Sequence, residues 1–136
     1  MPKTALLDSS VWVAYFSEED FFHKKAQRII DNLSRKNITI FIPDLVYIEV
    51  LNTLKRKMLL SKAKLNAARK FLKNYPLNKL IYRNYYFENE ENKLFTHLKS
   101  NLKSPDLLIF IHYLGLHADE FFTFDNKLKK YYKLNV

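Results

Sequence analysis

Cysteine is absent from the 136-residue sequence, and its absence excludes several kinds of site together. Without thiols the chain forms no disulfide, no thiolate metal site and no cysteine nucleophile, so oxygen and imidazole remain as metal ligands. The four histidines, His23, His97, His112 and His117, show no spacing typical of a metal site. We interpret each of them as a core or surface residue.

Long hydrophobic runs are also missing. No apolar stretch approaches the ~18 residues that a membrane span needs. The N-terminus lacks the charged start, apolar block and small-residue cleavage site of a secretory signal. We therefore expect a cytoplasmic protein that is not associated with a membrane.

Acidic residues are few beside basic ones: 14 Asp and Glu stand against 23 Lys and Arg, for a net charge of +9. Such an excess suits a polyanionic partner such as RNA, but it is also typical of a solvated lysine-rich surface, so charge alone leaves both open. The basic residues fall into four groups: Lys24, Lys25 and Arg28; Lys55, Arg56 and Lys57; Lys62, Lys64, Arg69, Lys70 and Lys73; and Lys127, Lys129, Lys130 and Lys133.

The chain has the length of one domain, residues 1–136, and 48% hydrophobic content supplies a core for it. Short apolar runs predict strands at 3–7, 38–42, about 80–82 and 121–124, with a further edge strand possible at 134–136. Helical spacing predicts helices at 11–16, 17–34, 45–57, 62–74, 88–99, 107–116 and 127–132. This alternation predicts a three-layer α/β/α fold around a mostly parallel sheet of four to five strands.

Asp8 follows the first apolar run directly and precedes Ser9 and Ser10. In open α/β sheets, ligands bind at the carboxyl ends of the strands, so an acid at this point is placed for chemistry. The alternative is that Asp8 only caps the next helix, a position for which Ser9 or Ser10 is equally suited.

Glu49 lies in a predicted helix with apolar residues on both sides and one turn away. We predict that its carboxylate is buried, and a buried acid needs a Lys or Arg partner, a metal ion or a raised pKa. Asp44, at the start of the same helix, is explained as its cap.

Two later acids also follow structural signals. Asp106 lies in the first turn of a helix that Ser104 and Pro105 begin, where it would also stabilise the helix dipole. Asp125 comes directly after the last strand, where a turn aspartate is the alternative. If the strands are parallel, Asp8, Glu49, Asp106 and Asp125 converge in an all-oxygen cluster, which suits Mg²⁺ or Mn²⁺.

These motifs resemble the PIN domain nucleases, including the toxins of VapBC-type toxin–antitoxin pairs, and the resemblance runs nearly end to end. Asp8 with its hydroxyl followers resembles the family's first acid, and residues 43–54 with Glu49 resemble the second motif. Asp106 in Ser-Pro-Asp-Leu-Leu-Ile resembles the third acid, and Thr123-Phe124-Asp125 resembles the closing Thr-x-Asp. The chain departs from the family pattern in bulky residues after the third acid, Ile109, Phe110 and His112, and in Leu128, where an aromatic is frequent.

The resemblance implies an endoribonuclease that uses Mg²⁺ or Mn²⁺, commonly a homodimer that an antitoxin neutralises. We expect the four acids to hold the metal, and Ser10 or Thr123 to orient a carboxylate or the attacking water. Three alternatives stay open: a PIN-like module that binds RNA or protein without cutting, a PIN nuclease of RNA processing without an antitoxin, and a flap-cleaving DNA nuclease. Four acids near the phosphates would oppose RNA binding by a module that did not cut, which disfavours the first.

Overall fold

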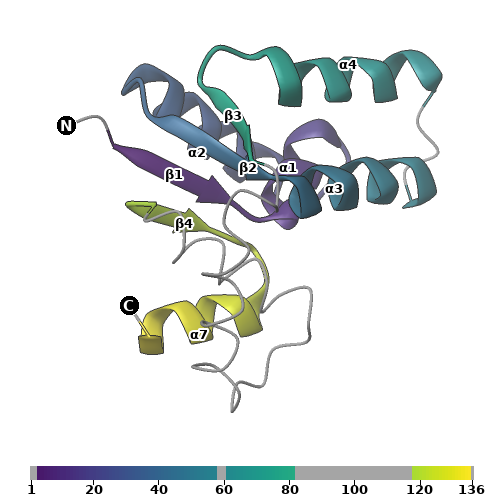
Figure 1. Ribbon diagram of the computed structural model, residues 1–136. Coiled ribbons are helices and arrows are strands. Elements are labelled where there is room, and N and C mark those ends of the chain that lie inside the picture. Colours follow the sequence, from purple (N-terminus) through teal and green to yellow (C-terminus); the bar gives the residue numbers. More distant parts are fainter. Residues whose placement is uncertain (1–2, 58–60, 82–117, 136) are drawn as a thin grey trace.

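The computed structural model describes residues 3–57, 61–81 and 118–135, and these form a parallel sheet of four strands with helices around it (Figure 1). The strand order is β3-β2-β1-β4, and every pair is parallel. The strands are β1 (Thr4–Leu7), β2 (Thr39–Pro43), β3 (Asn78–Ile81) and β4 (Glu120–Phe122). This confirms the predicted α/β class and the parallel sheet.

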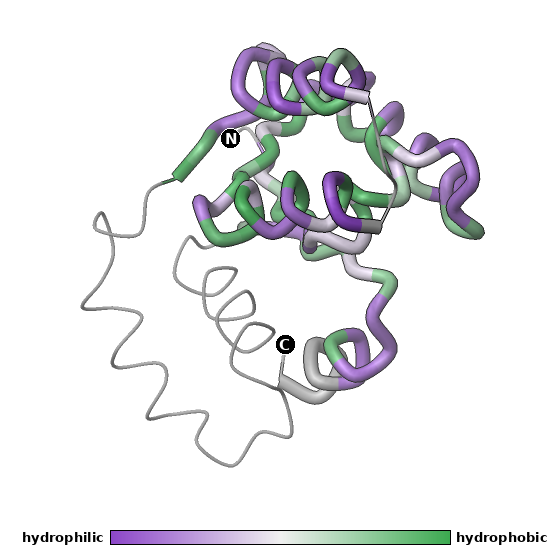
Figure 2. The backbone as a smooth tube through the Cα atoms, turned by 90° about the vertical axis from the view of Figure 1, so that its right-hand side faces the viewer, coloured by the Kyte–Doolittle hydropathy of each residue, from purple (hydrophilic) through white to green (hydrophobic). Residues whose placement is uncertain are grey.

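Helices connect and flank the strands in the three-layer α/β/α arrangement that the sequence predicts. They are α1 (Ser9–Phe16), α2 (His23–Arg35), α3 (Asp44–Lys57), α4 (Lys62–Asn74) and α7 (Asn126–Asn135). Figure 1 shows α4 beside β3 and α7 beyond β4, next to the two edge strands of the sheet. Hydrophilic and hydrophobic residues alternate along the helical turns in Figure 2, as expected for helices with one face on a core.

β1 is the centre of the core. Ala5, Leu6 and Leu7 have no exposed surface, because β1 pairs with β2 on one side and β4 on the other and is covered on its faces. Trp12 of α1 is also fully buried, and its ring stacks on Phe16 at a centroid distance of 6.0 Å. This packing fixes the first turn of α1 against the carboxyl end of β1.

Asn37 forms the turn between α2 and β2. Asn37 has a φ of 53°, in the left-handed region that Asn tolerates better than most residues. Ile38 N donates to Leu33 O at 3.0 Å, and Asn37 N donates to Ser34 O at 3.1 Å. These two bonds form a Schellman motif, which ends α2 and directs the chain into β2.

Several predicted boundaries were wrong, and hydrogen bonds to side chains explain three of them. α1 begins at Ser9 because the Asp8 carboxylate caps it, so neither serine is the cap. α2 begins at His23 instead of near residue 17, because Asp20 accepts from the backbone N of Phe22 at 2.8 Å and holds a turn there. β4 ends at Phe122 because Thr123 and Phe124 bond to the site described below.

At the C-terminus, Leu134 and Asn135 belong to α7, so the possible edge strand at 134–136 does not form as predicted. The helix at 62–74 has the predicted bounds. The predicted helices at 88–99 and 107–116 lie outside the described residues. Within the described ranges, no helix is long and apolar enough to span a bilayer.

Candidate active site

The Asp8 carboxylate lies at the carboxyl end of β1 and is only 3% exposed. Its Oδ1 atom accepts a hydrogen bond from the backbone N of Ser9 at 2.7 Å. Its Oδ2 atom accepts from Ser10 Oγ at 2.9 Å and from Thr123 Oγ1 at 2.8 Å. Asp8 is therefore both the helix cap and a buried acid at the sheet edge, and the bonds to both oxygens hold the carboxylate in one orientation.

The hydroxyl protons of Ser10 and Thr123 are both directed at Asp8. Phe124 N donates to Ser10 Oγ, and Asp125 N donates to Thr123 Oγ1, each at 3.0 Å. Because a backbone N–H can only donate, each hydroxyl oxygen accepts from the backbone and uses its single proton for the carboxylate. The loop after β4 is thereby fastened to the end of β1.

Glu49 lies near Asp8 through a shared hydroxyl. Ser9 Oγ donates to Glu49 Oε1 at 2.7 Å and lies 3.4 Å from Asp8 Oδ1. The shorter distance assigns the single hydroxyl proton to Glu49. Two acids from different elements, the end of β1 and the middle of α3, are thus held on either side of one side chain.

Glu49 is less buried than the sequence predicts. Its side chain is half-buried, and its neighbour Ile48 on α3 is 61% exposed, so this part of the helix is open to water. In the described part of the chain, its observed partner is the neutral hydroxyl of Ser9. Partial solvation and one strong hydrogen bond together make a charged Glu tolerable at this position.

Asp125 has a structural role in the described residues. Its Oδ1 atom accepts a hydrogen bond from Leu128 N at 2.9 Å, which is the side-chain cap of α7. Its backbone N also donates to Thr123, so Asp125 belongs to the Asp8 network through the main chain. The cap uses Oδ1 only, so it does not conflict with the predicted metal role of this carboxylate.

The structure thus brings Asp8, Glu49, Ser10 and Thr123 into one network and places the Asp125 backbone beside it. Asp106 lies outside the described residues. Within the described ranges, no three acidic or histidine side chains are grouped so that they could hold a metal ion. The convergence of all four acids therefore stays a prediction. The donors in the network are carboxylate and hydroxyl oxygens, which are the ligand type that Mg²⁺ and Mn²⁺ prefer.

Ser9 is the site residue whose position the sequence did not reveal. The sequence suggested it as a helix cap, whereas its hydroxyl connects the two acids. The available signal was its place directly after Asp8, but its contact with Glu49 depends on how α3 packs against α1. His23, which we interpreted as a core or surface residue, is partly buried and contacts Ala14 O through Nδ1 at 2.8 Å.

The structure is a parallel α/β sheet with Asp8 at the carboxyl end of β1, where the hydroxyls of Ser10 and Thr123 donate to its carboxylate. The chain belongs to the PIN domain family, whose model matches residues 5–134. It is similar in fold to VapC20 of Mycobacterium tuberculosis, a sarcin–ricin loop cleaving toxin, with a TM-score of 0.73 and 17% identity over 93% of this chain and 94% of that one.

A second solved structure with the same fold is VapBC2 of Rickettsia felis bound to a DNA fragment from its promoter. There the TM-score is 0.63 and the identity 20%, over 93% of this chain and 92% of that one. Among curated proteins, no sequence matches the chain.

Proposed function

We propose that this protein is an endoribonuclease that hydrolyses RNA phosphodiester bonds with Mg²⁺ or Mn²⁺, and that it is the toxin of a type II toxin–antitoxin pair. The observation that carries the proposal is the buried Asp8 carboxylate, whose oxygens accept from Ser9, Ser10 and Thr123. Three partners are more than a helix cap requires. Membership of the PIN domain family, a family of nucleases, supports the same conclusion.

In this proposal each residue has a defined role. Asp8, Glu49 and Asp106, with Asp125, hold the metal through oxygen. Ser10 and Thr123 orient the Asp8 carboxylate through the bonds described above. A bound Mg²⁺ or Mn²⁺ supplies activation of a water for in-line attack on phosphorus and neutralises charge on the leaving oxygen. No side chain is needed as a covalent nucleophile.

Metal dependence is the first test of the proposal. Purified protein is incubated with structured and with single-stranded RNA in Mg²⁺, in Mn²⁺ and in EDTA, and the products are separated on a gel. We expect cleavage of at least one RNA with either metal and none in EDTA. Equal cleavage in EDTA would contradict the proposed metal chemistry.

The toxin role needs a separate test. VapBC2, one of the structural neighbours, is a complex bound to promoter DNA. We propose by analogy that this protein has an antitoxin partner and that it forms a homodimer. Growth arrest on expression, and its rescue by a small DNA-binding protein encoded beside the gene, would support the role. Light scattering of the purified protein tests the dimer. Cleavage without growth arrest would favour a nuclease of RNA processing.

A further inference from the structure

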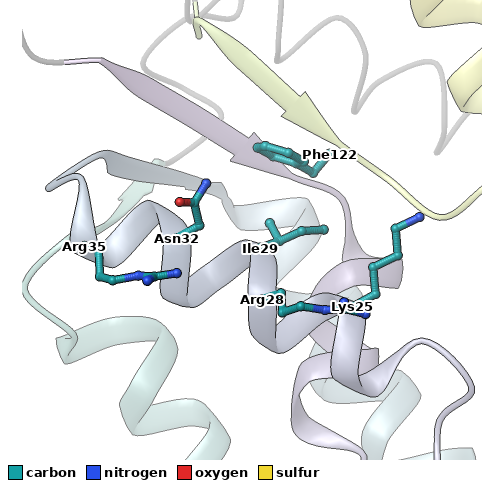
Figure 3. A pocket seen from close by; sticks show the side chains of 6 residues that line it. All are labelled: Lys25, Arg28, Ile29, Asn32, Arg35 and Phe122. Atoms are coloured by element: carbon teal, nitrogen blue, oxygen red, sulfur yellow. The ribbon is translucent and has the colours of Figure 1, made fainter.

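A groove lies between α2 and β4, made of two adjoining hollows that share Lys25, Ile29 and Phe122. Figure 3 shows the first hollow with the side chains that line it. The first encloses about 690 Å³ and the second about 410 Å³. The described residues that line this α2–β4 groove are Lys25, Arg28, Ile29, Asn32, Arg35, Phe121, Phe122, Thr123, Phe124 and Lys129.

The charge of the α2–β4 groove has one sign. Lys25, Arg28 and Arg35 project from the same side of α2, because their spacing returns them to one face of the helix. Lys129 adds a fourth cation from α7, and no acid is among the described lining residues. The cations on α2 cover about 15 Å, from the rise of ten helical residues. The other described lining residues are apolar or neutral. A long surface on which every charged lining residue is a cation fits an extended polyanion.

The end of the groove near α7 is aromatic. The Phe124 ring stacks on Phe22 at a centroid distance of 4.6 Å and an interplanar angle of 15°. The Nζ atoms of Lys25 and Lys129 lie 5.9 and 6.0 Å from the Phe124 centroid. Phe21 meets Phe22 edge-on at 5.0 Å and is 92% exposed. Flanking cations beside stacked rings, with one ring left open to solvent, suit a phosphate chain that carries unpaired bases.

The α2–β4 groove leads directly to the candidate active site. Thr123, which lines the second hollow, donates to Asp8 Oδ2 at 2.8 Å. Phe124, another lining residue, donates its backbone N–H to Ser10. A strand at this end of the groove would therefore contact the residues that hold Asp8 in place.

We infer that the α2–β4 groove binds a single-stranded segment of the RNA substrate, with phosphates along Lys25, Arg28 and Arg35 and an unpaired base on the open Phe21 ring. This inference rests on the proposed nuclease function and assigns its substrate-binding residues. Single-stranded RNA is favoured over a duplex because stacking needs an accessible base face.

The salt dependence of RNA binding tests the phosphate contacts. A labelled single-stranded oligoribonucleotide is titrated by fluorescence anisotropy with the Asp8→Asn variant, with and without Lys25→Ala/Arg28→Ala. Removing two phosphate contacts should lower the slope of log affinity against log salt by about 1.4. The matched control is Arg69→Ala/Lys70→Ala on exposed positions of α4, which removes the same charge from a helix that does not line the groove. Equal slopes for the two double variants would overturn the assignment.

The base contact has its own test. Phe21→Ala should weaken single-stranded RNA binding roughly tenfold and leave binding of a blunt RNA duplex unchanged. Because Phe21 is almost fully exposed, this change does not disturb the core. Equal effects on both RNAs would contradict base stacking. A poly-glutamate peptide that binds the Arg69→Ala/Lys70→Ala control but not Lys25→Ala/Arg28→Ala, with equal RNA affinity in the two variants, would show the groove to be a protein-binding site instead.

Cleavage assays separate failure of this inference from failure of the proposed function. If protein with intact Asp8 cleaves RNA while the groove variants bind and cleave as the α4 control does, only the groove assignment is wrong. If the protein neither binds nor cleaves RNA, the proposed function and the inference are both wrong.

Discussion

Ser9 Oγ lies 2.7 Å from Glu49 Oε1, and this hydrogen bond joins two residues 40 positions apart in the chain. It fastens the first turn of α1 to the middle of α3, and the same hydroxyl lies beside Asp8. The separation of the two acids is therefore set by a side chain that carries no charge itself.

Replacing Ser9 by Ala should destabilise the metal-free protein, because Glu49 then loses its hydrogen-bond donor. A bond to a charged group is worth about 1.5 kcal/mol or somewhat more, so we expect a loss of that order in the free energy of unfolding in urea. In a Glu49→Ala background the same change should cost less than about 0.5 kcal/mol, because the bond is already absent. An equal loss in both backgrounds would show that the hydroxyl does not act through Glu49.

Asp125 should respond differently to Asn and to Ala. Asn can still cap α7 by accepting from Leu128, whereas Ala cannot, so only Asp125→Ala should lose stability, by about 1 kcal/mol. If Asp125 also binds metal, both variants should show a smaller rise in melting temperature with Mn²⁺ than wild type. A full Mn²⁺ response in Asp125→Asn would restrict this residue to its capping role.

Because of Tyr15, the free energy of unfolding should depend on pH in the alkaline range. Burial raises the pKa of its phenol above 10.0, and the negative charge of Asp31 and the nearby Tyr75 add to the effect. The folded state then keeps a proton that the unfolded state has lost, so stability falls as the pH rises above about 10. Tyr15→Phe should lose less stability than wild type between about pH 8 and about pH 11 in denaturant titrations. The other tyrosines titrate in both proteins, so equal losses would contradict a buried phenol at this position.

The sequence was sufficient for those parts of the fold that depend on local signals. The helix at 62–74 was predicted with its observed bounds from the helical spacing of its apolar residues, and the structure adds that Ser61 caps it by accepting from Lys64 N. The parallel sheet followed from the alternation of apolar runs and helices. The late start of α2 was not predicted, because the acids at 18–20 resemble a first helical turn, while Asp20 in fact bonds to Phe22 N.

The candidate site was predictable in part for the same reason. Asp8 follows β1 directly and Asp125 follows the apolar run that contains β4, so their place beyond the carboxyl ends of strands could be predicted from the sequence. The bond from Thr123 to Asp8 joins residues 115 positions apart, and only the strand order brings them together. Contacts of that kind depend on tertiary packing, which one sequence does not encode in its local pattern.

Asp106→Asn tests the convergence of the acids without knowledge of the RNA target. Two carboxylates ~5 Å apart repel by about 3 kcal/mol at an effective dielectric of ~20, so removing one charge should raise the metal-free melting temperature. Loss of a helix-start charge opposes this by only ~0.3 to 1 kcal/mol. Mn²⁺ should then stabilise wild type more than the variant. A lower melting temperature with an intact Mn²⁺ response would remove Asp106 from the site.

The most direct measurement compares RNA cleavage by wild type and by Asp8→Asn in Mg²⁺ or Mn²⁺. The asparagine side chain can still cap α1, but its amide nitrogen cannot accept the bonds that Ser10 and Thr123 donate, so the fold should survive while the site fails. Replacing a residue that only hydrogen-bonds to a metal ligand lowers activity about 10- to 100-fold. Replacing the ligand itself should therefore lower the cleavage rate on the order of 100-fold or more. Asp31→Asn, at an exposed position of α2, is the matched control and should cleave as wild type does. Equal cleavage by Asp8→Asn and wild type would contradict the account.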